Sequence, residues 1–145
     1  MKTKVGIASD HAGYELKEFL KTYLEKRGYI IEDFGTHSTQ SMDYPDVAHP
    51  LALAVESKKV SFGVAVCGTG NGINIALNKH QGIRSALCWL PELATLAKEH
   101  NNANIIALPG RFISKIKAKA IIEAYLEAKF EGGRHSRRIR KIACK

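Results

Sequence analysis

The chain has 145 residues, of which 45% are hydrophobic and 25% charged, as is usual for soluble globular proteins and unlike a disordered chain. Its formal net charge of +8 invites a nucleic-acid-binding interpretation, but the last twelve residues alone carry six arginines and lysines and no acid. The basicity therefore belongs mainly to the C-terminal tail.

Other classes of protein are excluded by simple patterns. Charged residues in the first twenty positions exclude a secretory signal, and no apolar run reaches the length of about 18 residues that a membrane span needs. Cys67, Cys88 and Cys144 are too few and too widely spaced for a disulfide framework or a zinc site. We expect a cytoplasmic protein with free thiols, no metal, no cofactor and no membrane partner.

The predicted elements alternate between strands and helices along the chain. A strand at residues 4–9 precedes an amphipathic helix at 14–27, which Gly28 closes, and a strand at 29–34 precedes a loop and a helix at about 44–57. An apolar strand at 62–67, a helix at 72–79, a strand at 84–88, a helix at 92–99 and a strand at 105–108 follow. Ser114 can cap a helix that runs to about residue 130, where Gly132 and Gly133 end it, and a basic helix occupies about 134–144.

This order of elements predicts the fold class. Five strands alternating with helices predict a doubly wound, five-stranded parallel sheet with helices on both faces, a Rossmann-like α/β fold. We expect a single domain over residues 1–145. In such sheets ligands bind beyond the carboxyl ends of the strands, so the loops that follow strands are the places to seek a site.

The loop after the central strand reads CGTGNG, from Cys67 through Gly68, Thr69, Gly70 and Asn71 to Gly72. Its backbone amides and the following helix terminus would favour negative charge and would lower the pKa of a thiol beside them. Cys67 could therefore be a base or nucleophile, although a lone cysteine at a strand end is commonly a small core residue. The loop is not a nucleotide motif, because Ile73 stands where G-x-G-x-x-G requires glycine and no G-K-[ST] is present.

Candidate groups elsewhere have both a functional and a structural interpretation. Asp10 and His11 follow the first strand and could bind a hydroxyl and a phosphate, or Asp10 could simply cap a helix. His100, followed by Asn101, ends a helix and gains a proton-transfer role only if it faces the Cys67 loop. Arg111, after the fifth strand, is either a solvated charge or an anion ligand.

The tail, GGRHSRRIRKI, favours a small anion over a nucleic acid. Arg134 and Arg138 are four residues apart, on one helical face, where two guanidinium groups can hold one phosphate. A nucleic-acid arm would need interleaved aromatic residues or a wider basic surface, and the tail has neither.

These motifs together resemble the type B ribose-5-phosphate isomerases, a family that includes the subunits of galactose-6-phosphate isomerase. The similarity covers nearly the whole chain, through SDHAGYELK, YIIEDFGTHS, DYPDVA, CGTGNGINIALNK, GIRSALC, HNNANIIALPGR and EGGRHSRRIRKI. The resemblance implies aldose–ketose isomerisation of a sugar phosphate through a cis-enediol(ate), without metal or organic cofactor. It also implies homodimers or homotetramers with sites at the subunit interface.

Matching positions carry the family's roles onto this sequence. Cys67 would move the proton between the first two sugar carbons, and Thr69 with the amides of residues 68–72 would stabilise the enediolate. His100 would assist ring opening, with Asp10 handling ring hydroxyls. Asn71, in the same loop, departs from the aliphatic residue of many relatives. The remaining ligands would be Asn101 for a sugar hydroxyl and, for the phosphate, His11, Arg111, Arg134 and Arg138.

Three functions remain to be compared. Interconversion of ribose 5-phosphate and ribulose 5-phosphate in the pentose phosphate pathway is the first, and isomerisation of galactose or allose 6-phosphate is the second, because the chemistry is the same. A non-catalytic protein that binds sugar phosphate or nucleic acid is the third. Cys67, Asp10 and His100, taken to lie at one sheet edge, argue against this last function.

Overall fold

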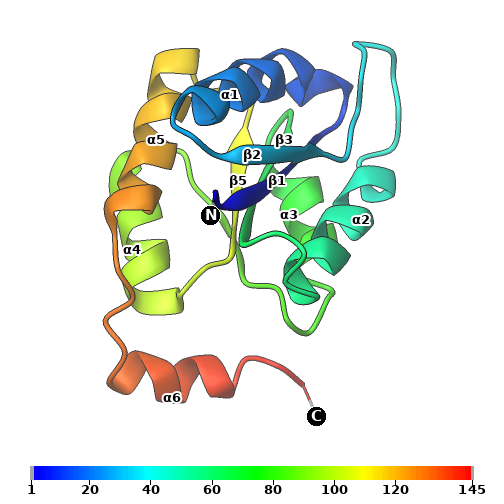
Figure 1. Ribbon diagram of the computed structural model, residues 1–145. Helices are drawn as coiled ribbons and strands as arrows, with labels where there is room; N and C mark the ends of the chain where they lie inside the picture. Colours follow the sequence, from blue (N-terminus) through cyan, green and yellow to red (C-terminus); the bar gives the residue numbers. More distant parts are fainter. Residues whose placement is uncertain (1, 145) are drawn as a thin grey trace.

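A computed structural model describes residues 2–144, and its five strands form one sheet in the order β2-β1-β3-β5-β4 (Figure 1). All four strand pairs are parallel. The strands are β1 (Lys4–Ser9), β2 (Ile30–Asp33), β3 (Phe62–Cys67), β4 (Ser85–Leu87) and β5 (Ile105–Pro109). The central strand β3 is buried along its whole length, because helices cover both faces of the sheet.

Two helical layers enclose the sheet, as the doubly wound fold predicts. α1 (Tyr14–Lys26), α4 (Pro91–Asn101) and α5 (Lys115–Glu127) pack on one face, where Val64 of β3 points. α2 (Pro45–Glu56) and α3 (Asn71–Leu77) cover the other face, where Ala65 and Cys67 point. A 3₁₀ turn, η1 (His11–Gly13), leads into α1, and α6 (Arg134–Arg140) lies outside both layers.

The ends of several elements differ from the sequence-based expectation. The helix expected to reach residue 130 ends at Glu127, because Ala128 adopts an extended conformation and the amide of Glu131 bonds the carbonyl of Glu99 on α4. The final helix ends at Arg140, short of residue 144, and Lys145 lies outside the described residues. Ser114 does cap α5, accepting a hydrogen bond from the amide of Lys117 at 3.0 Å. Within residues 2–144, no helix is both long and apolar enough to cross a membrane.

A buried ion pair fixes the loop that follows β2. The side chain of Lys17 on α1 is fully buried, and its Nζ lies 2.6 Å from Oδ2 of Asp33. Oδ1 of Asp33 accepts a hydrogen bond from the amide of Gly35 at 2.9 Å. Burial alone would raise the pKa of Asp33, but the bonds from Lys17 and Gly35 outweigh it and hold the pKa below its usual value. The pair thus ties α1 and β2 to the start of the loop near the carboxyl edge of the sheet.

Candidate active site

Cys67 ends β3 at the carboxyl edge, where the loop after β5 closes over it. Cys67 is only 4% exposed, and its carbonyl accepts a hydrogen bond from the amide of Gly110 at 2.8 Å. The amide of Arg111 donates to the carbonyl of Gly68 at 3.0 Å. Because β3 and β5 are parallel and pair Cys67 with Pro109, both strands end together and their loops meet.

The turn after Cys67 depends on glycine. Gly70 has a φ of 78°, and a Cβ there would collide with the side chain of Leu87. A Cβ on Gly72 would lie 2.6 Å from the ring of Tyr44, which therefore packs directly on the loop. Tyr44 is a residue that the sequence analysis did not single out, because only the tertiary structure brings it to the loop.

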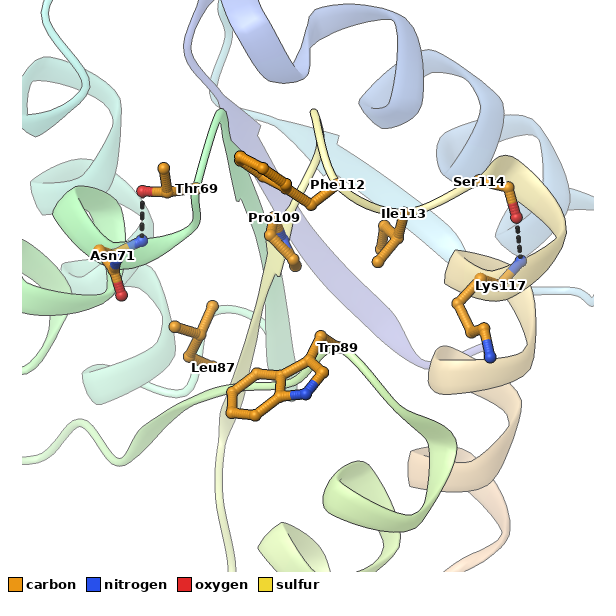
Figure 2. A pocket seen from close by; sticks show the side chains of 9 residues that line it. All are labelled: Thr69, Asn71, Leu87, Trp89, Pro109, Phe112, Ile113, Ser114 and Lys117. Atoms are coloured by element: carbon orange, nitrogen blue, oxygen red, sulfur yellow. Dashed lines mark hydrogen bonds between the residues drawn. The ribbon is translucent and has the colours of Figure 1, made fainter.

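Thr69 is exposed in this turn, and its hydroxyl donates to no other residue within 2–144. Its Oγ1 accepts a hydrogen bond from the amide of Asn71 at 3.2 Å (Figure 2). A threonine hydroxyl has one hydrogen and two lone pairs, so accepting this bond leaves the hydrogen available for a ligand.

Asp10 and His11 lie beside the same turn. The amide of Asp10 bonds the carbonyl of Val66 at 3.2 Å, and its Oδ1 accepts from the amide of Gly13 at 3.1 Å, so the capping role considered from the sequence is real. Nδ1 of His11 accepts a hydrogen bond from the amide of Met42 at 3.2 Å. In a neutral imidazole the proton is then on Nε2, which can donate to an anion.

Arg111 completes this group. Its Cδ and Nη1 both lie 3.4 Å from where a Cβ on Gly68 would be, so the side chain extends over the turn. The carboxyl edge therefore brings together a buried thiol, a carboxylate, an imidazole, a hydroxyl and a guanidinium, from Cys67, Asp10, His11, Thr69 and Arg111.

A cavity of about 490 Å³ opens next to this group (Figure 2). Thr69 and Asn71 border it on the side of the turn, while Trp89 and Phe112 supply aromatic walls. Lys117 at the start of α5 adds a cation. The cavity offers space beyond the turn for a small polar molecule with an apolar contact surface.

His100 lies at the opposite edge of the sheet. It is in the last turn of α4, which leads from the carboxyl end of β4 back to the start of β5. Strand β5, which starts near His100 and ends at Pro109 beside Cys67, spans roughly 13 Å by itself. Proton transfer needs contact at about 3 Å, so His100 is too far from Cys67 of the same chain. The expectation that His100 and Cys67 share a sheet edge within one chain is therefore wrong, because the connection between parallel strands returns the chain to the amino edge.

Asn101, Arg134 and Arg138 are also at the amino edge. α6 packs against α4, and the His135 ring of α6 stacks on the His100 ring with centroids 4.3 Å apart. In Figure 1 α6 lies below the sheet, at the end where β5 begins. The candidate residues thus form two groups, one at each edge, and a single chain does not bring the groups together.

Arg84, just before β4, binds the end of α4 in the amino-edge group and was not singled out from the sequence. Its Nε donates to the carbonyl of Asn101 at 3.0 Å, and its Nη2 donates to the carbonyl of Asn102 at 3.0 Å. Asn102 ends α4 in the left-handed conformation, with a φ of 45°. Arg84 therefore fixes the end of the helix that carries His100. No local pattern marks this role, since it depends on tertiary contact.

His135 and Glu131 were also not singled out. Nε2 of His135 lies 3.5 Å from Oε1 of Glu131. Burial, together with the neighbouring His100, Arg134 and Arg138, lowers the pKa of His135, although Glu131 opposes the shift.

Comparison with known proteins identifies the family. A family model described as Ribose/Galactose Isomerase matches residues 5–142. The chain belongs to the ribose/galactose isomerase family. Ribose-5-phosphate isomerase B of Escherichia coli (strain K12) is 42% identical over 139 residues, which cover 96% of this chain and 93% of that protein.

Solved structures within the ribose/galactose isomerase family have the same fold. A ribose 5-phosphate isomerase from Thermotoga maritima superimposes with a TM-score of 0.96 at 50% identity, over 99% of both chains. Ribose-5-phosphate isomerase B from Mycoplasma genitalium, solved with bound ribulose-5-phosphate, gives 0.94 at 38% identity, over 98% of this chain and 95% of that one. The resemblance inferred from the motifs and the Rossmann-like fold class are thereby confirmed.

Proposed function

We propose that this enzyme interconverts ribose 5-phosphate and ribulose 5-phosphate, a step of the pentose phosphate pathway, through a cis-enediol(ate) intermediate. The observation that carries the proposal is the Cys67 thiol at the end of β3, set beside a turn of backbone amides and a free hydroxyl donor. The relative from Mycoplasma genitalium with bound ribulose-5-phosphate supports the substrate class.

Cys67 acts as the base that moves the proton. As a thiolate it takes the proton from C2 of the open-chain aldose, a C1–C2 double bond forms, and O1 takes the negative charge and then a proton. The thiol returns its proton to C1 while O2 loses its proton and becomes the ketose carbonyl. No group is gained or lost, so the step is an internal oxidation and reduction of the sugar.

The turn stabilises the charge that develops on the sugar oxygen. The Thr69 hydroxyl and the amides of Gly68, Gly70 and Gly72 form an oxyanion site, since each is a donor at the carboxyl edge, while the amide of Asn71 holds the Thr69 hydroxyl in place. Oδ1 of Asp10 accepts the hydrogen bond from the amide of Gly13, and Oδ2 accepts a hydrogen bond from a sugar hydroxyl. Nε2 of His11 and the guanidinium of Arg111 bind the phosphate from the same edge.

The remaining groups come from a second copy of the chain. His100 assists opening of the furanose ring, Asn101 binds a sugar hydroxyl, and Arg134 and Arg138 bind the phosphate. Their position at the amino edge supports a homodimer, or a homotetramer built from dimers, in which one copy's amino edge meets the other's carboxyl edge.

A substrate comparison tests the function. We expect purified enzyme to convert ribose 5-phosphate with a higher kcat/KM than galactose 6-phosphate or allose 6-phosphate in a coupled assay. Cys67→Ala should abolish turnover and leave ribose 5-phosphate binding largely intact by calorimetry. Turnover by Cys67→Ala would contradict the proposed base, and activity on the hexose phosphates alone would reassign the substrate.

We also place the enzyme in the cytoplasm. Its phosphorylated substrates carry charges that make passage through a bilayer unfavourable, so they stay in the compartment where they are made. Fractionation of cells with an antibody against the chain tests this, and recovery from a secreted fraction would contradict it.

A further inference from the structure

Two histidines and a glutamate meet at the amino edge. Oε1 of Glu131, in the segment before α6, lies 3.8 Å from Nε2 of His100 and 3.5 Å from Nε2 of His135. The ligand atoms of all three residues lie within 4.8 Å of one another. The segment that ends α5 early and the contact between α4 and α6 create this cluster.

His135 is the residue that points to a ligand. Its side chain is only 7% exposed, and Nε2 is buried without a hydrogen-bond partner among the described residues. A buried imidazole nitrogen left unpaired costs free energy, so such groups in native proteins are generally satisfied. Here the nitrogen faces the carboxylate of Glu131, and a cation between them would satisfy both.

The donor set suits a transition metal. Two imidazoles and one carboxylate are a common zinc ligand set, and ligands around a tetrahedral ion lie about 3.4 Å apart. The 3.5 Å separation of His135 and Glu131 fits directly. The stacked rings of His100 and His135, at 12° to each other, have to tilt so that both Nε2 lone pairs meet one ion.

Metal can reach this site from solvent. In the single chain, the side chains of His100 and Glu131 are 37% and 50% exposed, so two of the three ligands face outward, toward the cleft that the proposed second copy borders, while His135 forms the inner wall. Arg134 and Arg138, which help lower the pKa of His135, reduce the affinity for a dication. The arrangement therefore suits reversible occupation better than a permanent structural ion.

We propose that His100, Glu131 and His135 bind one divalent transition-metal ion per chain, with Zn²⁺ as the natural candidate. The ion takes Nε2 of His100, so occupation withdraws this imidazole from the substrate and inhibits isomerisation. Binding stands independently, whereas inhibition rests on the function proposed for His100.

Direct titration tests the binding. We expect calorimetry of the metal-free enzyme with Zn²⁺ to give one equivalent per chain, and Co²⁺ to give the visible absorption of a tetrahedral site. Glu131→Gln, at an exposed residue, and His135→Gln should each weaken Zn²⁺ binding by at least about tenfold. Unchanged binding in a folded Glu131→Gln variant would overturn the proposal.

Two controls address exposed groups elsewhere that could also bind a metal ion. His49 Nδ1 and His80 Nε2 lie 2.7 Å apart, and Cys144 is exposed. His80→Gln and Cys144→Ser should each still bind one equivalent of Zn²⁺ per chain. Loss of Zn²⁺ binding in either variant would show that the ion binds elsewhere and would refute the proposed site. Zn²⁺ should inhibit isomerisation by His80→Gln as strongly as it inhibits the wild type. Inhibition of Glu131→Gln, measured against the rate of that variant without metal, should be much weaker. Absence of any isomerase activity would refute the proposed function and leave the binding result to stand by itself.

Discussion

The guanidinium of Arg84 holds the carbonyl of Asn102 with two donors, Nε at 3.1 Å and Nη2 at 3.0 Å. Lysine cannot reproduce this fork, since its ammonium has no planar pair of donors. We therefore expect Arg84→Lys to loosen the end of α4 and to lower kcat about tenfold, with a smaller change in KM.

The control for this positioning role is a double-mutant cycle. In a His100→Ala background, Arg84→Lys should have little further effect on kcat, because the side chain that it positions is gone. Fully additive losses in the cycle would show that Arg84 acts only on general stability.

Mixed oligomers test whether sites are shared between copies. Cys67→Ala removes the proposed base at the carboxyl edge, and His100→Ala removes the proposed ring-opening group at the amino edge. Co-expression of the two strongly impaired chains should therefore restore about a quarter of wild-type activity, because half of the dimers are mixed and each of these has one intact site. Separately purified single variants provide the baseline. No recovery in isolated mixed dimers would mean that each site is built within one chain.

The Lys17–Asp33 pair should make stability depend on pH. The pKa of Asp33 is lowered in the folded protein, so its contribution is present above the unfolded pKa of about 3.9 and is lost as pH falls through the folded value. Asp33→Asn should cost about 3 kcal/mol of unfolding free energy at pH 7, because the buried ammonium of Lys17 then keeps only the half-exposed carboxylate of Glu18, 2.8 Å away, as an acidic partner. Urea denaturation should show this difference shrinking below about pH 4. A difference that stays constant to pH 3 would exclude the ion pair as its cause.

Cys88 and Cys144 should differ in reactivity. Burial raises the pKa of Cys88 to about 12, so its thiol stays protonated at pH 8, while Cys144 is exposed. Mass spectrometry after brief iodoacetamide treatment should find Cys144 modified and Cys88 unmodified until the protein is unfolded. Early labelling of Cys88 in the native enzyme would show that the α4 side of the sheet opens readily.

Gly70→Ala should damage the turn beside Cys67. The positive φ costs about 1 kcal/mol for alanine, and the new methyl group collides with Leu87, so we expect a larger loss of stability and a sharp fall in kcat. Gly28→Ala is the matched control, because Gly28 also has a positive φ, 96°, but nothing lies within 4 Å of the new methyl. Equal losses in thermal melting would show that the collision is unimportant.

Much of the fold followed from local patterns, and part of the site did not. The alternation of apolar strands and amphipathic helices predicted the parallel sheet, and CGTGNG located the thiol at its carboxyl edge. The position of His100 could have been predicted too, since a helix between parallel strands must finish at the amino edge. The contact of His135 with Glu131 could not, because it depends on the extended segment after Glu127 and on the packing of α6 against α4.

The separation of the two groups of residues also constrains the symmetry of the proposed dimer. Each copy carries the Cys67 group at one end of its sheet and the His100 group at the opposite end. In a head-to-tail arrangement, one group of each kind would remain without a partner, and the chain of copies could extend into a filament. A two-fold axis that sets the sheets antiparallel closes both contacts at once and gives two equivalent sites. Dilution that separates the copies then silences both sites together, so the specific activity should depend on protein concentration.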